Sequence, residues 1–295
     1  MSFASIVKNE VSKINTNDSE KLTLLSAIVH DNYNGNIKIT TENASIARLV
    51  FQLFKDVCRK TPKITVRNNY QNHYLYILEM NNQECIKQLS LTNIPPKYLL
   101  DDEECVRSYL MGLFLMSGSI NDPKTSRYHL EFNVDNLEYA NFISELLNKY
   151  NLNSKVIKKG NTYMVYIKEA EKIGDFLRII KAFNAVLYYE DIRIYRDHKN
   201  MTNRLNNCEQ ANMDRVIKTA LEQVKQIETI ISKGGLELLD EKEQLVANYR
   251  MKYKDVSLEE LSEIISFETN NKITKSGLYH RFKKIKDLAN KLSSW

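Results

Sequence analysis

The feature that most constrains the fold is an internal duplication in the first two thirds of the chain. In the first half, an alternating strand at 37–40 is followed by capping residues, an amphipathic helix and a β-hairpin. The second half repeats that order, from a strand at 128–132 to a hairpin at 155–167. An apolar helix precedes each copy, at 22–29 and at 106–116. This repeat predicts two αββαββα-like lobes and therefore an α+β fold.

A change in pattern separates the lobes from a helical C-terminal part. The prolines at 95–96 predict a turn or linker between the lobes, because consecutive prolines cannot continue a helix. After Asp197 we expect an asparagine-rich connector at 203–207, and then a helix that the glycine pair at 234–235 ends. The predicted domains are 1–94 for the first lobe, 95–199 for the second lobe, 200–235 for a helical linker and 236–295 for the C-terminal helical domain.

The composition is that of a soluble globular protein, with 43% hydrophobic and 27% charged residues in a chain of 295. The longest apolar run, Tyr109–Met116, is too short to span a bilayer, which needs about 20 residues. The N-terminal residues lack the basic and apolar regions of a signal peptide. We therefore expect a cytoplasmic protein that makes no membrane contact.

The cysteines and glycines give no support for a cofactor. Cys58, Cys85, Cys105 and Cys208 are far apart in sequence, which favours reduced thiols over a disulfide framework or a zinc site. The five histidines are equally dispersed, so no metal site is expected. Neither of the two glycine-rich phosphate-binding motifs is present among the 8 glycines.

The positive charge of the chain is concentrated at its C-terminus. The whole chain has a net charge of +5, whereas the segment 272–295 alone carries +6 and the remainder −1. A basic end on a nearly neutral body indicates a module that binds a polyanion. A solvated, lysine-rich tail is the alternative that charge alone leaves open.

The last helices of the chain have the pattern of a helix-turn-helix. A helix near 241–253 is followed by one that opens with a capping box formed by Ser257 and Glu260. The final helix opens at 274–276 and its apolar face consists of Leu278, Phe282, Ile285 and Leu292. A short helix followed by a basic amphipathic one is typical of DNA-binding domains that insert the second helix in the major groove. Many three-helix domains share the pattern without binding nucleic acid.

The exposed side of that final helix holds the residues predicted to contact DNA. They are Lys275, Ser276, Tyr279, His280, Lys283 and Lys284. We expect Ser276 and Tyr279 to lie nearest the base edges, because hydrogen-bonding side chains near the start of a recognition helix reach the bases. We expect Lys275 and Lys284 to lie nearer the phosphates.

Motifs spread over nearly the whole chain resemble the WhiA family of bacterial regulators, which is named for sporulation and linked to cell division. The matching segments include 41–44 (TENA), 107–112 (RSYLMG), 190–194 (EDIRI), 203–212 (NRLNNCEQAN) and 275–281 (KSGLYHR). The resemblance implies a degenerate LAGLIDADG homing-endonuclease scaffold, joined to a helix-turn-helix similar to region 4 of sigma factors. It further implies a sequence-specific regulator of transcription that acts in cell division, chromosome segregation or sporulation.

The same resemblance predicts that the scaffold does not cleave DNA. In LAGLIDADG enzymes the first helix of each lobe ends in an acidic residue that binds a divalent metal, and two such carboxylates support phosphodiester cleavage. Here the alignment places Ser117 at one of these positions and Val29 at the other, with Asp31 two residues further on. Serine is a poor Mg²⁺ ligand, so we predict no catalytic residue, no metal and no enzymatic activity. A residual endonuclease is the runner-up.

The LAGLIDADG resemblance also implies that the paired sheets form a saddle over DNA. The basic residues expected on outward strand positions are Lys38, Lys63, Arg67, Lys155 and Lys158. Glu131 on a comparable face counts against a uniform patch, and ordinary solvated strands explain the pattern almost equally well. A second basic group, which either touches phosphate or pairs with nearby acids, contains Arg193, Arg196, Lys199 and Arg204.

Double-stranded DNA is the partner that this sequence favours most. Another transcription factor or RNA polymerase is a further expected partner. A third hypothesis is an interaction scaffold, in which the lobes hold a protein partner and the C-terminal domain localises the complex. The basic final helix argues against a purely protein-binding role.

Overall fold

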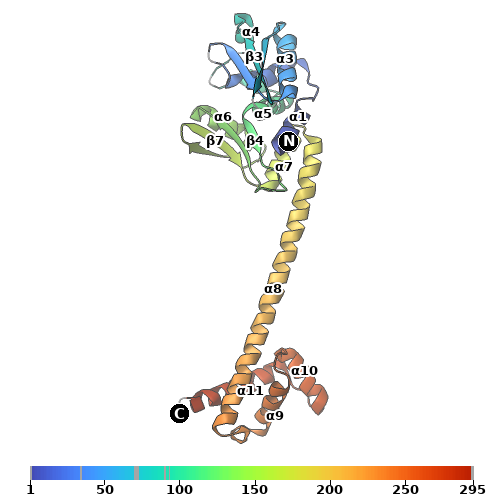
Figure 1. The fold of residues 1–295 in the computed structure, drawn as a ribbon, viewed down its shortest axis with the longest axis vertical. Helices are drawn as coiled ribbons and strands as arrows, with labels where there is room; N and C mark the ends of the chain where they lie inside the picture. The colour runs from blue at the N-terminus through green and yellow to red at the C-terminus, as the bar shows by residue number, and fades with distance from the viewer. Residues whose placement is uncertain (1, 34, 70–72, 90, 93, 294–295) are drawn as a thin grey trace. The chain divides into compact units, whose positions relative to one another are not determined.

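The computed structural model divides the chain into two compact units, Met1–Asp197 and His198–Trp295, each with its own hydrophobic core (Figure 1). It describes every residue except 1, 34, 70–72, 90, 93 and 294–295. The side chains at 69 and 73 are also outside the description.

The first lobe is a three-stranded antiparallel sheet with helices on one face. Its strands run in the order β1-β3-β2, so β1 and β2 are edges. Its elements are α1 (Phe3–Val11), α2 (Asp18–His30), β1 (Ile37–Thr41), α3 (Ala44–Cys58), β2 (Lys63–Asn69), β3 (His73–Met80) and α4 (Gln83–Gln88). The predicted hairpin is formed by β2 and β3, which pair antiparallel, and residues 70–72 between them are outside the described residues.

The second lobe repeats this plan with a four-stranded sheet in the order β4-β5-β7-β6. Its elements are η1 (Lys97–Leu100), α5 (Glu103–Ser117), β4 (Gly118–Ile120), β5 (Leu130–Val134), α6 (Leu137–Asn148), β6 (Lys155–Lys159), β7 (Thr162–Ile167) and α7 (Ala170–Ile179). The predicted duplication is confirmed. Among the described residues, the first lobe has only an isolated bridge between Tyr33 and Ile37 where the second lobe has β4.

The two lobes meet where α2 packs against α5. Gly112 lies in this contact, and a Cβ atom added there would be 2.6 Å from the carbonyl oxygen of Leu24 and 2.8 Å from the Cβ of Ala27. Only glycine permits so close an approach of the two helices. Because α2 and α5 are buried along most of their length, the lobes share one continuous core.

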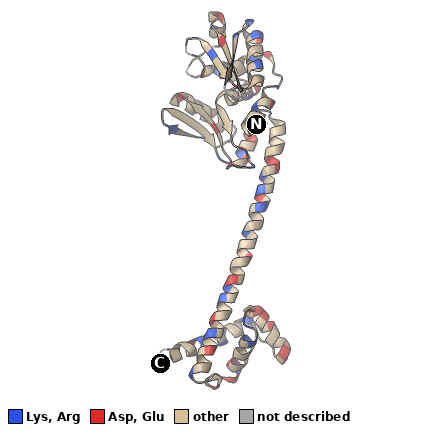
Figure 2. Cartoon of the chain, viewed as in Figure 1, with Lys and Arg blue, Asp and Glu red and all other residues tan. Residues whose placement is uncertain are grey.

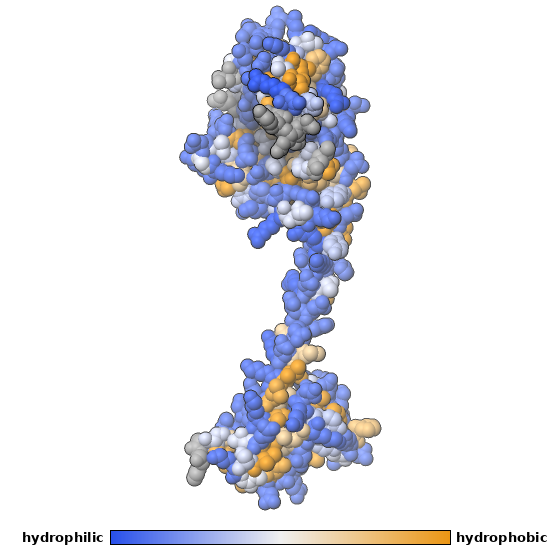
Figure 3. Space-filling view, in the orientation of Figure 1, coloured by the Kyte–Doolittle hydropathy of each residue, from blue (hydrophilic) through white to orange (hydrophobic). Residues whose placement is uncertain are grey.

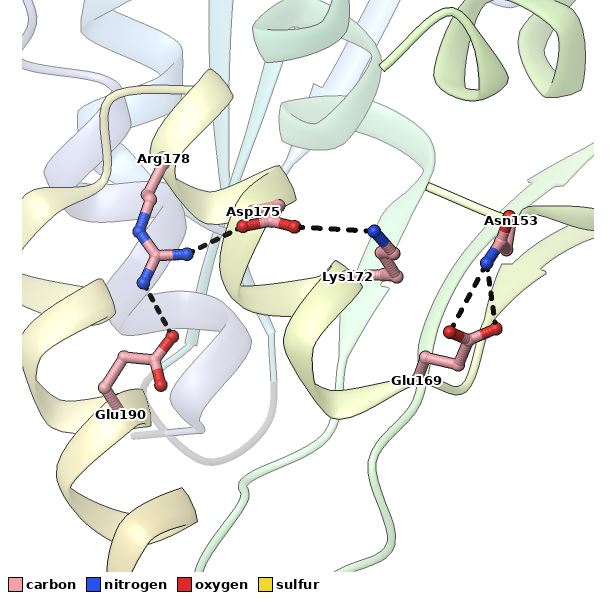
Figure 4. A network of polar contacts seen from close by, with 6 residues as sticks. All are labelled: Asn153, Glu169, Lys172, Asp175, Arg178 and Glu190. Atoms are coloured by element: carbon pink, nitrogen blue, oxygen red, sulfur yellow. Dashed lines mark hydrogen bonds and ion pairs between the residues drawn. The ribbon is translucent and has the colours of Figure 1, made fainter. Parts of the chain in front are cut away.

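A single helix, α8 (Phe183–Lys233), runs from the first unit into the second. Its first turns are held by Glu190, which accepts hydrogen bonds from Arg178 at 2.8 Å and from Arg193 at 2.6 Å. Arg178 also pairs with Asp175 in a wider polar network (Figure 4).

The prediction of a connector at 203–207 is wrong, because α8 continues through these residues without a break. Asparagine lowers helix propensity only weakly, and the flanking turns override that preference. The exposed length of α8 is predominantly hydrophilic (Figure 3). The four domain limits given above stay a prediction, and the limit at 199 falls inside this helix.

The second unit packs three helices against the end of α8. After η2 (Leu236–Leu238) come α9 (Glu241–Lys252), α10 (Leu258–Thr269) and α11 (Lys275–Ser293). Their core includes Ile227, Ile230, Val246, Leu261, Ile265, Leu278, Phe282 and Ile285. The capping box at the start of α10 is confirmed, since Ser257 accepts from the Glu260 amide and Glu260 accepts from the Ser257 amide. No helix in the described part of the chain is long and apolar enough to cross a membrane.

The expectation of reduced cysteines is wrong for one pair. Cys58 at the end of α3 and Cys85 in α4 form a disulfide, with their Cα atoms 5.1 Å apart. The hairpin between them reverses the chain and brings α4 beside α3, which a separation of 27 residues does not reveal. Cys105 and Cys208 are free thiols.

Candidate nucleic-acid interface

The start and the buried side of α11 are set by local chemistry. Thr274 precedes the helix, and its hydroxyl accepts a hydrogen bond from the Gly277 amide at 3.2 Å, which satisfies a free donor of the first turn. Leu278, Phe282 and Ile285 recur every three to four residues and are buried. The predicted apolar face is therefore confirmed, and the opposite side of α11 faces solvent.

The connection from α10 to α11 is short. The helix α10 continues to Thr269 and ends at Asn270, whose φ of 54° lies in the left-handed region. Ser266 then fixes the turn, since its hydroxyl accepts from the Ile273 amide at 2.9 Å. Five residues therefore connect the two helices, close to the short turn of a helix-turn-helix.

The middle of the solvent face of α11 combines hydrogen-bonding and basic side chains. Ser276, Tyr279, His280 and Lys283 are all exposed. Tyr279 is 60% exposed, and its ring lies edge-on to that of His280 at 5.9 Å between centroids. Neither His280 nor Lys283 has an ion-pair partner within the described residues. This face presents donors, acceptors and positive charge of the kind that read base edges and phosphates.

The two lysines expected near phosphate form exposed ion pairs with carboxylates of the same unit. The Nζ of Lys275 lies 3.0 Å from Glu259 at the start of α10. The Nζ of Lys284 lies 2.9 Å from Glu243 and 3.8 Å from Asp240, at the start of α9. The hydrogen bond with Glu243 raises the pKa of Lys284. Carboxylates thus lie beside both lysines, because tertiary packing brings the acidic first turns of α9 and α10 beside α11.

Strand register decides which basic residues share a sheet face. In the first lobe Lys38, Lys63 and Arg67 all lie on the face opposite the helices, as predicted. Glu79 on the central strand stands directly between Lys38 and Lys63, and its carboxylate lies 3.9 Å from Lys38. This face therefore carries positive charge with one carboxylate at its centre.

The prediction for the second sheet needs a correction. Lys155 pairs with Tyr166 on the open face, which also holds Glu131, but Lys158 pairs with Tyr163 on the helix-covered side. Side chains alternate along a strand, so residues three apart point to opposite faces. Lys159, four residues after Lys155, lies on the open face and was missed, although the same alternation identifies it.

The ends of α2 and α5 do not have the donors of a two-metal site. The hydroxyl of Ser117 donates to the carbonyl of Leu113 at 3.1 Å, and Val29 is fully buried. Asp31 caps the end of α2 and lies 3.1 Å from the Nδ1 of His30. The described residues contain no group of three His, Cys, Asp or Glu side chains that would hold a metal ion. A divalent pair therefore does not fit these positions.

The arginines where the lobes meet α8 have structural partners. Arg193 pairs with Glu190 at 2.6 Å. Arg196 donates to the carbonyls of Pro123 and Ser126 and lies 4.8 Å from the centre of the Tyr128 ring. Lys199 and Arg204 are exposed on α8. The structure thus favours pairing with an acid for Arg193, whereas Arg196 binds backbone carbonyls and an aromatic ring.

Three family models match the chain, in order and without overlap. They are described as the WhiA N-terminal LAGLIDADG-like domain (residues 25–92), the WhiA LAGLIDADG-like domain (106–199) and the WhiA C-terminal HTH domain (202–289). The matches follow the two lobes and the helical C-terminal part.

Relatives from two bacteria share the same name. Proteins named "Probable cell division protein WhiA" from Bacillus cytotoxicus and Clostridium botulinum are each 40% identical to this chain, over alignments of 311 and 316 residues. These alignments cover 99% of this chain and 97% and 99% of the respective relatives.

Solved structures agree with the fold. Full-length DUF199/WhiA from Thermotoga maritima superposes with a TM-score of 0.60 at 25% identity, covering 99% of both chains. The N-terminal LAGLIDADG domain of DUF199/WhiA covers 61% of this chain and 92% of its own length, with a TM-score of 0.50 at 22% identity. The fold is thus two LAGLIDADG-like lobes followed by a helix-turn-helix region, and the chain belongs to the WhiA family.

Proposed function

We propose that this protein is a non-enzymatic regulator of transcription that binds specific sequences of double-stranded DNA through α11. The observation that carries the proposal is the solvent face of α11, where Ser276 is exposed and neither His280 nor Lys283 has an ion-pair partner within the described residues. Buried Leu278 and Phe282 hold the opposite side of this helix in the core of the second unit. Rigid presentation of such a face suits direct readout in the major groove. The names of its relatives support a role in cell division.

The open faces of the two sheets are a second, weaker candidate for DNA contact. Lys38, Lys63, Arg67, Lys155 and Lys159 supply positive charge there, while Glu79 and Glu131 oppose it. We infer that these faces attract the duplex or hold it through phosphate contacts and do not recognise its base sequence. Roles in chromosome segregation or sporulation, a location at the nucleoid, and contact with RNA polymerase or another transcription factor are further parts of the proposal and need separate tests.

The test maps bound sites across the genome and then measures affinity for the preferred site and for a scrambled duplex. Tyr279→Ala and His280→Ala are each expected to cost about 1–3 kcal/mol on the preferred site and little on the scrambled one. Both side chains are exposed, so melting temperatures should be unchanged. If well-folded variants keep full affinity and the same site preference, α11 is not the recognition helix.

A further inference from the structure

The first lobe has an open apolar groove on the helix-covered side of its sheet. We call it the lobe-1 groove; its volume is about 830 Å³, and its apolar lining includes Ile14, Leu49, Phe51, Ile64 and Val66. Ile64 and Val66 are 45% and 51% exposed, because they lie on the edge strand β2 beyond the cover of α3. Exposed β-branched side chains beside a hollow of this size mark a surface that burial by another chain would stabilise.

The rim of the lobe-1 groove is basic. Lys13, Lys21 and Arg48 line it, and Asp56 is the acid that lines it with them. Asp56 pairs with Lys21 at 3.0 Å. Lys13 and Arg48 are exposed and have no ion-pair partner within the described residues. The groove is therefore complementary to a segment that combines an apolar anchor with negative charge.

The helix α10 has these properties. Its twelve residues include four carboxylates and no lysine or arginine (Figure 2). Two of these carboxylates, those of Glu259 and Glu268, pair with lysines of the same unit. Phe267 is 86% exposed, an unusual state for a phenylalanine. Glu263 lies one turn before it on the same face and has no ion-pair partner within the described residues. We call this face the α10 knob.

The α10 knob is unsuited to nucleic acid, because the carboxylate of Glu263 would be repelled by phosphates. A protein surface with basic groups is the binding site that its charge favours. Helices commonly dock by placing anchors spaced three to four residues apart in a hydrophobic groove.

We propose that the α10 knob of one molecule docks in the lobe-1 groove of a second copy, with Phe267 against Ile64 and Val66 and with Glu263 facing Arg48. Such a contact joins two different surfaces, so it links molecules head to tail. The groove lies on the side of the sheet opposite Lys38 and Lys63, and the knob is on a different helix from the face of α11. Self-association through these surfaces goes beyond DNA binding and does not depend on it.

Sedimentation velocity on the full chain without DNA tests the proposal. The average mass of the wild-type protein should rise reversibly with concentration. Val66→Asp and Phe267→Ser should each raise the dissociation constant by about 30-fold or more, the size of a hot-spot loss. Both side chains are exposed, so the variants should keep the wild-type melting temperature.

A charge exchange gives the sharper test. Arg48→Glu and Glu263→Arg should each weaken self-association, because each sets like charges against one another. An equimolar mixture of the two variants should regain it, since every contact between unlike molecules again joins opposite charges. Lys55→Glu on α3 and Glu237→Arg in η2 make the same charge changes at exposed positions outside the groove and the knob, and should have no effect.

Three results would overturn the proposal. They are a wild-type mass that does not depend on concentration, undiminished association of well-folded Val66→Asp and Phe267→Ser, and failure of the charge-exchange mixture to recover.

Discussion

The two units differ in how close their exposed basic residues lie to carboxylates. On the sheets, Glu79 separates Lys38 from Lys63, and Glu131 shares the open face with Lys155. On the middle of α11, Lys283 has no ion-pair partner within the described residues, although Asp287 follows it by one helical turn. The lysines on its flanks pair with Glu259 and Glu243. The number of lysines alone would make the sheet faces and α11 equally good candidates for binding a polyanion. The positions of the carboxylates favour α11.

The units also differ in the partners of a cation in their interiors. Each places one cation over a phenylalanine ring, Lys8 at 5.6 Å from Phe114 and Arg250 at 5.4 Å from Phe282. Burial lowers the pKa of Lys8 to about 8 and that of Arg250 to about 10. Arg250 donates two hydrogen bonds to the carbonyls of Tyr253 and Val256, whereas Lys8 has no ion pair within the described residues. In the second unit, the hydrogen bonds of Arg250 hold the segment between α9 and α10 in place. Lys8 in the first unit has no such role among the residues described.

The largest expected effect tests whether the two units are independent. Phe282→Ala should destabilise the second unit by about 3–5 kcal/mol, because it opens a cavity in a small core and removes the ring beneath Arg250. In calorimetry of the full chain, the transition of the second unit should move down while that of the first stays in place. A common shift of both transitions would show that the units unfold together.

A smaller effect of opposite sign is expected at Lys8. Unfolded lysine titrates near 10.5 and folded Lys8 at about 8, so the unfolded state binds more protons between these values and stability rises with pH across this window. Below pH 8 the full cost of burying the charge is present. Lys8→Met should therefore stabilise the first unit by up to about 3 kcal/mol at pH 7 and abolish the rise between pH 8 and 10.5. Unfolding at several pH values measures both, and an unchanged pH profile would contradict this account.

Arg250→Met is the matched substitution in the second unit and should have the opposite sign. Removing the guanidinium leaves the carbonyls of Tyr253 and Val256 without these donors, which should cost about 1–3 kcal/mol. Thermal unfolding of the second unit is the measurement. A gain in stability would mean that the desolvation cost of the charge outweighs its two hydrogen bonds.

The smallest expected effect concerns the salt dependence of DNA binding. Lys283→Ala should reduce the log–log salt slope by about one, because each neutralised phosphate contributes about 0.9. Lys38→Ala should change it less, since Glu79 already lies beside that lysine. Titrations of one duplex at several salt concentrations compare the two variants. An equal change in the salt slope for both variants would mean that the sheets and α11 contribute equally to phosphate contacts.

Local sequence patterns predict the structure correctly where a feature depends on residues within a single helix or strand. The repeat of strands and helices, the capping box at Ser257 and the buried face of α11 follow from periodicity and from hydrogen bonds within a few residues. Strand alternation is a local rule of the same kind, and it is sufficient to place Lys158 and Lys155 on opposite faces. The exposed candidates Ser276, Tyr279, His280 and Lys283 belong to this group of local predictions.

The amino-acid sequence by itself therefore determined the duplicated lobes, the helix-turn-helix and the residues available on the solvent face of α11. Tertiary structure alone decided that Lys275 and Lys284 form ion pairs with Glu259 and Glu243, and that Cys58 meets Cys85. It also decided that Phe267 of the α10 knob and Ile64 and Val66 of the lobe-1 groove are exposed. The physical reason is distance along the chain. Helix and strand periodicities act over a few residues, whereas ion pairs, disulfides and grooves join residues that only packing brings together.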